Sequence, residues 1–305
     1  MEETMLEPSG VLIVNKPAGM TSHDVVGKIR RLYGLRRVGH TGTLDPMATG
    51  VLVVLIGRAA KAAEYLMSEQ KSYTATLRLG LVTDSGDTTG NVLSTCESLP
   101  DFAELKAILP RFRGEIEQIP PMYSAIKQNG KKLVDLARRG ITVEREPRKI
   151  TIFRLEAFPT EVKSDYRLEV TCSGGTYIRT LCEDIGAALG CGGTMASLCR
   201  TETGGFTLDR SHTPEELAEA SMEQRLSLLL PIESLFENLP ALRPEPFYEK
   251  LIRTGCAVLQ SKLGCNLPAD TMLRLQDSAG HFFALGKVLE TEEGLAVKAI
   301  KTFVL

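Results

Sequence analysis

An unbroken apolar run, Val51-Leu52-Val53-Val54-Leu55-Ile56, constrains the fold of this chain more than any other stretch. Its length suits a β-strand, and because it lacks the alternation of a half-exposed strand, it should be buried on both faces. Residues 37–50, directly before it, contain three glycines and a proline, which break helices and strands. We therefore predict a polar loop that is fixed to a central core strand and can hold a side chain over a cleft.

Asp45 is the only acid of this loop, and Pro46 stiffens the backbone behind it. A carboxylate there should be ionised near neutral pH and could act as a nucleophile, a base or a metal ligand. An Asp-Pro turn without any chemistry is the simplest alternative. A phosphate-binding loop is a second alternative, because residues 34–41 almost fit its pattern, but His40 stands where the essential lysine belongs. The phosphate loop is therefore excluded, and the plain turn stays open.

The composition excludes several classes of protein. The 305 residues suffice for a large and a small domain, and the apolar content of 43% predicts a packed core. No apolar run approaches the length of a membrane span, and residues 1–10 lack the basic start of a signal peptide. The seven cysteines are scattered and lack zinc-site spacing, so we expect reduced thiols, no metal site and a cytoplasmic protein.

Hydrophobic periodicity and capping residues predict the other elements. A strand at 10–17 ends at a proline, and a helix capped by Thr21 or Ser22 runs to Tyr33. The further predicted elements are a helix at 59–66, a strand at 71–80, a helix at 102–109, strands at 149–158 and 167–173, a helix at 176–189, a strand at 194–207 and a mostly helical segment at 214–230. Residues 83–90 are a turn cluster, because their two aspartates lack the spacing of a calcium loop. Proline-rich residues 239–246 predict a linker to a small β-rich module.

Two groups of cations stand out against a net charge of only −2. The first group abuts the Asp45 loop and is either a solvated helix face or a footprint for a phosphate backbone; it contains Lys28, Arg30, Arg31, Arg36 and Arg37. The second group lies between residues 127 and 149, around a short predicted helix at 133–138. A hairpin-like arm that presents cations fits this second pattern and is suited to gripping RNA.

The loop sequence Gly-His-Thr-Gly-Thr-Leu-Asp-Pro at residues 39–46, followed by Ala-Thr-Gly at 48–50, resembles the catalytic loop of the TruB family of tRNA pseudouridine synthases. Lys16-Pro17, Lys71-Ser72-Tyr73 and the segment 173–180 resemble three further motifs of this family. The resemblance covers about residues 10–206. One departure follows Leu198, where the family usually has two basic residues and this chain has Cys199-Arg200; it concerns a peripheral contact.

The resemblance implies roles for seven residues. It makes Asp45, Tyr73 and Arg179 catalytic, with Tyr73 also stacking on the base, and it places His40, Tyr177, Leu198 and Lys16 in the substrate site. His40 is expected to hold the RNA loop or its phosphate rather than to act as a base. The residues themselves add one expectation: an arginine in the first turn of a helix is electrostatically unfavourable, so Arg179 should pair with a carboxylate, for which Asp45 is the candidate.

The resemblance implies isomerisation of uridine 55 in the T-loop of tRNA to pseudouridine, with the base flipped out and its glycosidic bond broken and remade. It implies no cofactor and no metal, the T-arm of tRNA as partner, and a protein that acts as a monomer. The implied fold is α+β: a mixed, mostly antiparallel central sheet flanked by helices in residues 1–238, and a PUA-like RNA-binding module in residues 239–305.

Two other functions stay open at this point. An RNA-folding protein, acting as a tRNA chaperone without essential catalysis, would use the same basic arm and C-terminal module. An N-glycosidase would use Asp45 on a nucleoside and release the free base to water. The sequence also leaves open whether Asp45 attacks C1′ of the sugar or C6 of the base.

Overall fold

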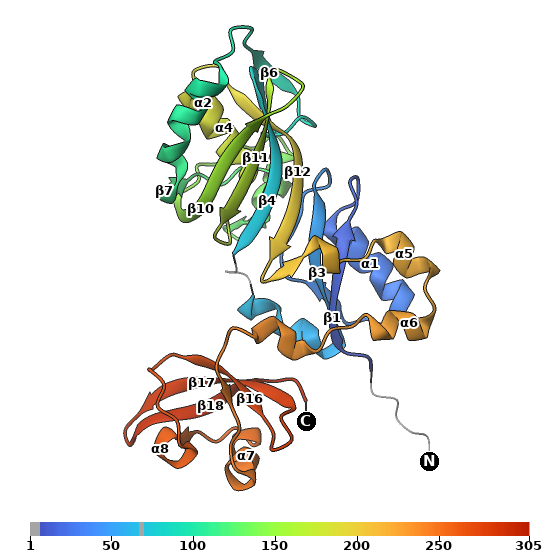
Figure 1. The fold of residues 1–305 in the computed structure, drawn as a ribbon, viewed down its shortest axis with the longest axis vertical. Helices are drawn as coiled ribbons and strands as arrows, with labels where there is room; N and C mark the ends of the chain where they lie inside the picture. The colour runs from blue at the N-terminus through green and yellow to red at the C-terminus, as the bar shows by residue number, and fades with distance from the viewer. Residues whose placement is uncertain (1–6, 67–69, 305) are drawn as a thin grey trace.

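The computed structural model describes residues 7–66 and 70–304 as an elongated molecule, with a large sheet above a smaller C-terminal sheet (Figure 1). Within these residues the large sheet has nine strands, and its main order is β1-β3-β12-β4-β11-β10-β7. These strands are β1 (Gly10–Lys16), β3 (Thr49–Ile56), β12 (Gly193–Thr203), β4 (Lys71–Leu79), β11 (Asp165–Cys172), β10 (Arg148–Pro159) and β7 (Gly114–Gln118). The short strands β2 (Val38–His40) and β13 (Phe206–Thr207) pair with β3 and β12.

The pairing of this sheet is antiparallel except between β12 and β3, which run parallel through Cys199–Thr49 and Arg200–Gly50. The predicted α+β class with a mixed, mostly antiparallel sheet is therefore confirmed. The parallel contact joins two segments that are about 150 residues apart in the chain, so it brings the Asp45 loop next to β12.

Strand β3 is buried on both faces, as its unbroken apolar run predicts. Val51, Val53 and Leu55 face one core cluster, which includes Val11 and Phe206. Leu52, Val54 and Ile56 face a second cluster, which is formed with Val25, Val26 and Ile29 of the helix α1 (Ser22–Tyr33). At about 25 cal/mol per Å² of buried apolar area, such a strand contributes several kcal/mol and fixes the adjoining loop to the core.

The N-terminal half of the sheet is covered by three helices (Figure 1). A capping box of Thr21 and Asp24 begins α1, and Gly34 follows its end in the left-handed conformation. The predicted cap at Thr21 and the predicted end at Tyr33 are confirmed. The predicted helical segment 214–230 is two helices, α5 (Pro214–Glu219) and α6 (Met222–Ser227). It breaks because Ala220 is extended and Ser221 caps a new helix.

The other half of the sheet packs against a second core, in which the buried face of β4 meets α2 (Phe102–Ile108), the short helix η2 (Leu109–Phe112) and α4 (Ile178–Ala188). Between β3 and β4 lies the 3₁₀ helix η1 (Gly57–Tyr65), which corresponds to the helix predicted at 59–66. The predicted turn cluster 83–90 connects β5 (Leu81–Thr83) and β6 (Val92–Thr95).

Residues 119–147, between β7 and β10, form the arm that the second group of cations predicts. It contains the two-residue strands β8 (Lys127–Gln128) and β9 (Lys131–Lys132), followed by α3 (Leu133–Ala137). Asn129 and Gly130 turn the hairpin with positive φ angles of 51° and 78°. We call residues 119–147 the arm.

The C-terminal residues form a second sheet of order β14-β16-β17-β18-β15. Its strands are β14 (Ala241–Leu242), β15 (Val258–Leu259), β16 (Met272–Gln276), β17 (Phe282–Thr291) and β18 (Gly294–Thr302), and its helices are α7 (Pro246–Arg253) and α8 (Gln260–Leu263). The predicted β-rich module is therefore confirmed, whereas its boundary between residues 238 and 239 stays a prediction. Because β14 pairs with β16, part of the proline-rich segment belongs to this sheet.

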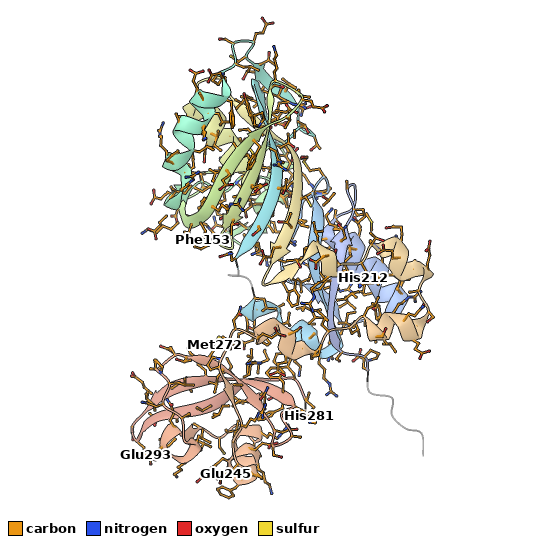
Figure 2. All side chains as sticks on the ribbon, in the orientation of Figure 1. Phe153, His212, Glu245, Met272, His281 and Glu293 are labelled. Carbon is orange, nitrogen blue, oxygen red and sulfur yellow. The ribbon has the colours of Figure 1, made fainter. Side chains whose placement is uncertain are left out.

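The C-terminal module packs firmly on the rest of the molecule. Phe282 and Phe303 lie in one core cluster with Phe236 of the 3₁₀ helix η4 (Ile232–Phe236), with ring centroids 5.5–6.0 Å apart. Met272 lies on the side of the module that faces this helix (Figure 2). Two ion pairs cross the same junction, Lys301–Glu64 at 2.6 Å and Arg274–Glu233 at 2.9 Å. The helices among residues 7–66 and 70–304 include none that is long and apolar enough to cross a membrane.

Candidate active site

The loop that carries Asp45 is fixed to the start of α1. The hydroxyl of Ser22 accepts from the backbone N–H of Leu44 at 2.9 Å and lies 3.2 Å from the Leu44 carbonyl oxygen, to which it donates. The backbone oxygen of Asp45 accepts from Ala48 N at 3.0 Å. The simple turn that the sequence left open is thus present, and Asp45 is its first residue.

Lys16 also holds this loop in place, from the end of β1. Its side chain is fully buried at the end of β1, and Nζ donates to the carbonyl oxygens of Pro17 at 2.9 Å, Met20 at 2.6 Å and Pro46 at 3.2 Å. Burial lowers the pKa of Lys16 to about 8, although the nearby Asp45 carboxylate raises it. Since three carbonyls occupy its three donors, Lys16 positions the loop in this structure, and its predicted contact with substrate stays a prediction.

Arg200 clamps both ends of the loop and was not predicted to do so. It is 1% exposed, its Nε donates to Val51 O at 2.7 Å, and its Nη2 donates to Gly42 O at 3.1 Å. Gly50 allows this approach: its φ is +102°, and a Cβ there would lie 2.2 Å from the carbonyl oxygen of Arg200. The sequence interpretation treated Cys199-Arg200 as a peripheral departure, whereas the structure places Arg200 under the loop itself.

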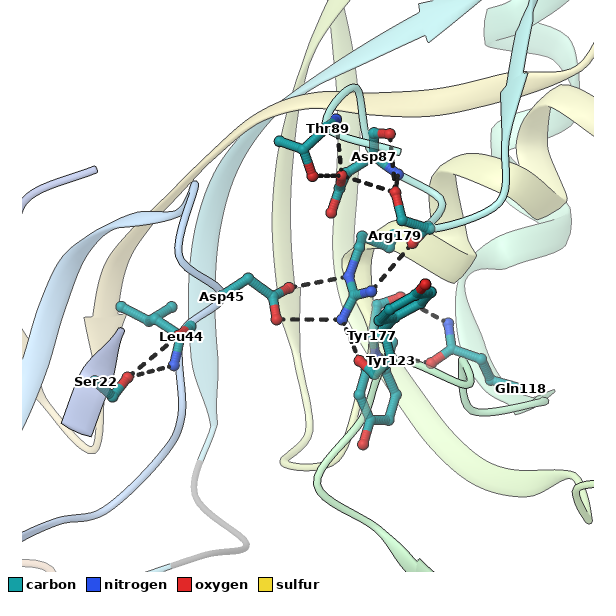
Figure 3. A network of polar contacts seen from close by, with 10 residues as sticks. Ser22, Leu44, Asp45, Asp87, Thr89, Gln118, Tyr123, Tyr177 and Arg179 are labelled. Carbon is teal, nitrogen blue, oxygen red and sulfur yellow. Dashed lines mark hydrogen bonds and ion pairs between the residues drawn. The ribbon is translucent and has the colours of Figure 1, made fainter. Parts of the chain in front are cut away.

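Asp45 and Arg179 form a two-point ion pair (Figure 3). Arg179 Nε lies 2.9 Å from Oδ2 and Nη2 lies 3.2 Å from Oδ1. Arg179 is 4% exposed in the first turn of α4, where the helix dipole disfavours a cation, so its charge needs this partner. The predicted pairing of the two side chains is confirmed.

The electrostatics of Asp45 combine opposing influences. Burial raises the pKa of its carboxyl above the ordinary value, and the Arg179 guanidinium opposes that shift. A second carboxylate, Asp87, raises the pKa further; it is 6% exposed and accepts from Ser85 Oγ at 2.9 Å and from Thr89 N at 3.0 Å. Asp87 comes from the 83–90 turn cluster, to which the sequence interpretation gave no role.

Tyr73 and Leu198 form the apolar floor beside Asp45. Each is 8% exposed, and they share a core cluster with Leu44 and Ala48 of the loop. Tyr73 on β4 lies opposite Arg200 on β12. Burial raises the pKa of Tyr73, while Arg200 opposes the rise and Asp45 adds to it. A tyrosine, a leucine and a carboxylate therefore converge, as an aromatic platform with an adjoining charge requires.

Tyr177 is the N-cap of α4, and its main chain is held by a buried glutamine. Gln118 donates from Nε2 to Tyr177 O at 3.0 Å and accepts the Tyr177 N–H at 2.8 Å. Burial raises the pKa of Tyr177, and Asp45 is near enough to add to the shift. Tyr177 therefore lies at the same site as Arg179, as predicted.

His40 lies at the end of β2, with its ring edge-on to that of His23 at a centroid distance of 5.5 Å. Its Nδ1 is buried and has no hydrogen-bond partner among residues 7–66 and 70–304. Burial, together with the nearby His23 and Arg200, lowers the pKa of His40 to about 4. The ring is therefore neutral at pH 7 and would hold RNA by hydrogen bonding and contact rather than by charge.

Both basic groups leave cations exposed. In the first, Lys28 pairs with Glu215 at 2.7 Å and Arg30 donates to Val38 O at 2.8 Å, while Arg31, Arg36 and Arg37 are exposed. In the arm, Lys127, Lys131, Lys132, Arg138 and Arg139 are exposed, and none of them forms an ion pair within the described residues. Across residues 7–66 and 70–304, no group of three His, Cys, Asp or Glu side chains could hold a metal ion.

Comparison with known proteins identifies the family. Residues 30–178 match the model of the TruB family pseudouridylate synthase N-terminal domain, and residues 179–237 match that of the tRNA pseudouridylate synthase B C-terminal domain. The chain is 41% identical over 295 residues to the tRNA pseudouridine synthase B of Clostridium kluyveri, covering 97% of this chain and 99% of that protein. The chain belongs to the TruB family. It is thus a pseudouridine synthase, an isomerase that converts uridine to pseudouridine in RNA.

Other TruB-family relatives and solved structures agree with this assignment. The tRNA pseudouridine synthase B of Pseudomonas fluorescens is 44% identical over 286 residues, or 92% of each chain. Among solved structures, a Cbf5–Nop10–Gar1 complex has a chain with 26% identity and a TM-score of 0.76 that covers 97% of this chain and 85% of its own. An archaeal box H/ACA Nop10–Cbf5 complex gives 25% identity and a TM-score of 0.74, covering 97% and 86%.

Proposed function

We propose that this protein converts uridine 55 in the T-loop of tRNA to pseudouridine. The observation that carries the proposal is Asp45, which is held by Arg179 through two contacts and by a loop that Ser22, Lys16 and Arg200 fix to the core. The relatives named tRNA pseudouridine synthase B support tRNA as the substrate. The exposed cations of the arm supply a surface for the RNA backbone.

The proposed reaction is a redox-neutral isomerisation. The target base is flipped out of the RNA loop and stacks on Tyr73, a contact worth about 1–3 kcal/mol. With Asp45 as the catalytic carboxylate, the bond between N1 and C1′ breaks, the base turns, and a bond forms between C5 and C1′; C5 then loses its proton and N1 gains one. Every atom except that exchanged proton stays in the product, so the chemistry needs no donor group or cofactor.

Each predicted side chain has a proposed task in this reaction. Arg179 keeps Asp45 charged and oriented, because a bidentate guanidinium favours the ionised carboxyl against burial. Leu198 and Tyr177 shape the pocket for the flipped base, and neutral His40 contacts the opened loop. The protein is proposed to work as a monomer in the cytoplasm, with a C-terminal PUA-like module in residues 239–305.

Analysis of the nucleosides in treated T-arm RNA tests the proposal. We expect pseudouridine at position 55 and at no other uridine of the stem-loop. Unchanged uridine together with tight binding would favour the RNA-folding protein, and free uracil would favour the N-glycosidase. A substrate with uridine 55 replaced by cytidine is the matched negative control.

A further inference from the structure

Arg179 is hydrogen-bonded to Tyr123, near the start of the arm, as well as to Asp45. Its Nη2 donates both to Asp45 Oδ1, at 3.2 Å, and to the carbonyl oxygen of Tyr123, at 2.8 Å. Figure 3 shows Tyr123 and Asp45 on two sides of the same guanidinium. The contact with the arm is the shorter of the two. A shift of the main chain at Tyr123 would therefore turn the group that orients Asp45.

The residue directly before the arm forms a second contact with α4, the helix that carries Arg179. Gln118 ends β7 and is 2% exposed, and it forms two hydrogen bonds with the main chain of Tyr177, the N-cap of α4. Residues 118–123 thus contact the first turn of α4 at both of their ends. This segment can transmit movement of the arm to the first turn of α4.

The outer part of the arm is anchored on the same segment. Val134 N donates to Ser124 O at 3.1 Å, and Leu133 N donates to Ile126 O at 2.8 Å. Leu133 is 2% exposed and is the buried residue of α3. The five exposed cations of the arm, Lys127, Lys131, Lys132, Arg138 and Arg139, flank this anchored helix. A displacement of these cations would therefore move α3 and, through its hydrogen bonds to Ser124 and Ile126, the neighbouring Tyr123.

We infer that the arm positions Arg179, in addition to gripping RNA. When RNA fixes the exposed cations, α3 holds Ser124 in place, and the Tyr123 carbonyl then holds the guanidinium in the orientation that Asp45 needs. Tyr123, Ser124 and Leu133 act through Arg179 and are positioning residues. The inference rests on the proposed function, since it assumes an RNA substrate. It predicts that grip and positioning can be separated by mutation.

Two changes remove positioning and leave the cations in place. Leu133→Ala loosens the anchor of α3. Replacing Ser124 by its α-hydroxy acid turns the Tyr123 carbonyl into an ester carbonyl, a weaker acceptor, without altering any side chain. We expect both to lower the single-turnover rate at saturating T-arm RNA at least tenfold, while the Kd for RNA changes less than threefold. The ester at 124 also removes the Ser124 N–H, which donates to Met122 O at 2.9 Å. The ester at exposed Thr142 is the control for ester incorporation and should match wild type in both quantities.

A third variant tests the grip alone. Lys127→Ala/Lys131→Ala/Lys132→Ala should raise the Kd at least tenfold, with a smaller loss in the rate at saturation. The inference is wrong if Leu133→Ala and the ester at 124 raise the Kd and keep the wild-type rate at saturation, because the arm would then be a grip only. It is also wrong if both reduce rate and affinity in the same proportion as the lysine variant.

Two controls keep these outcomes distinct from other failures. Thermal unfolding identifies a misfolded Leu133→Ala, and the ester at 124, which keeps every side chain, then decides the question. If the wild-type protein forms no pseudouridine in T-arm RNA, the proposed function fails, irrespective of the arm. If wild type is active and the 124 ester is as fast as the 142 ester, the coupling fails and the proposed function stands.

Discussion

The cations of the active site and those of the arm are the same residue types in opposite environments. Lys16, Arg179 and Arg200 are at most 4% exposed, and each donates to carbonyl or carboxylate oxygens of the protein. Five cations of the arm are exposed and form no ion pair within the described residues: Lys127, Lys131, Lys132, Arg138 and Arg139. Buried cations fix geometry, because removing one leaves its buried oxygen partners without a hydrogen-bond donor. Exposed cations instead offer positive charge that can pair with RNA phosphates. Changes in the first group should therefore alter the rate, and changes in the second should alter affinity.

The largest expected effect is that of Asp45→Asn, which retains the shape of the side chain and removes its charge. We expect pseudouridine formation to vanish and the Kd for T-arm RNA to change less than threefold. Because the pKa of Asp45 is raised in the folded protein, its ionised carboxyl does not stabilise the fold, so the variant should unfold no more easily than wild type. Nucleoside analysis and thermal unfolding on one preparation check both points. Exposed Asp209→Asn is the control, and a well-folded, fully active Asp45→Asn would end the catalytic assignment.

Arg179→Lys should slow the reaction by roughly 10²–10³-fold, the equivalent of about 3–4 kcal/mol. A lysine keeps the charge but cannot reach the two Asp45 oxygens, Ser85 O and Tyr123 O together. Exposed Arg138→Lys on the arm makes the same chemical change and should leave the rate within twofold. Equal rates for the two variants would remove the contrast between buried and exposed arginines.

Phe303→Ala tests whether the C-terminal module is a firmly packed part of the protein, like the active site, or an exposed binding surface, like the arm. Most of its cations are engaged, as in Arg274–Glu233 and Lys301–Glu64, so we expect the module to resemble the buried site more than the arm. Phe303 is 1% exposed in the shared core, and its loss should reduce the free energy of unfolding by about 3–5 kcal/mol. Denaturant unfolding measures this loss, with exposed Phe247→Ala as control. Removal of residues 239–305 should likewise lower stability, and it should weaken RNA binding while some activity remains at high RNA concentration.

Arg138→Ala/Arg139→Ala should make the affinity for RNA less dependent on salt concentration. Each lost phosphate contact reduces the slope of log K against log salt by about 0.7–0.9, so the double variant should lose about 1–2 units of slope. Its rate at saturating RNA should fall less than its affinity. Binding titrations between low and moderate salt provide the slope. An unchanged slope would mean that these two arginines do not meet phosphates.

The smallest effect concerns His40 and pH. Because burial lowers its pKa to about 4 from an ordinary value near 6.5, the unfolded chain binds this proton first as the pH falls. Stability due to His40 is therefore present above pH 6.5 and is lost between pH 6.5 and 4, by about 1–2 kcal/mol after allowance for partial exposure. His40→Asn should flatten that part of the stability curve, and exposed His281→Asn should not. Identical curves for wild type and His40→Asn would contradict a buried, neutral ring.

Local chemistry predicted much of this molecule. The bounds of α1 follow from Thr21, Asp24 and Gly34, and the burial of β3 follows from its unbroken apolar run. The pairing of Asp45 with Arg179 follows from an unfavourable helix position that needs an anion. The shape of the arm follows from glycines and a clustered charge. Except for the partner of Arg179, which lies 134 residues away in the chain, these signals lie within a few residues of the feature that they specify.

What escaped prediction depends on distant segments. Arg200 is recognisable only when the parallel pairing of β12 with β3 places it beneath residues 42–51. Asp87 belongs to an ordinary turn until the fold brings that turn to Asp45. Lys16 was assigned to substrate by resemblance, and its three carbonyl partners come from segments up to 30 residues away. Register and crossover are set by tertiary packing, which a single sequence does not display.

The shared core of Phe236, Phe282 and Phe303 also has a consequence for synthesis. The ribosome completes the catalytic sheet and η4 before it makes β17 and the segment that follows β18. At about 5–20 residues per second, the wait between Phe236 and Phe303 is roughly 3–13 s. During that time the core cluster that contains Phe206, Leu235 and Phe236 lacks Phe282, Leu285 and Phe303. The nascent catalytic half is therefore the stage at which this chain should most need a chaperone.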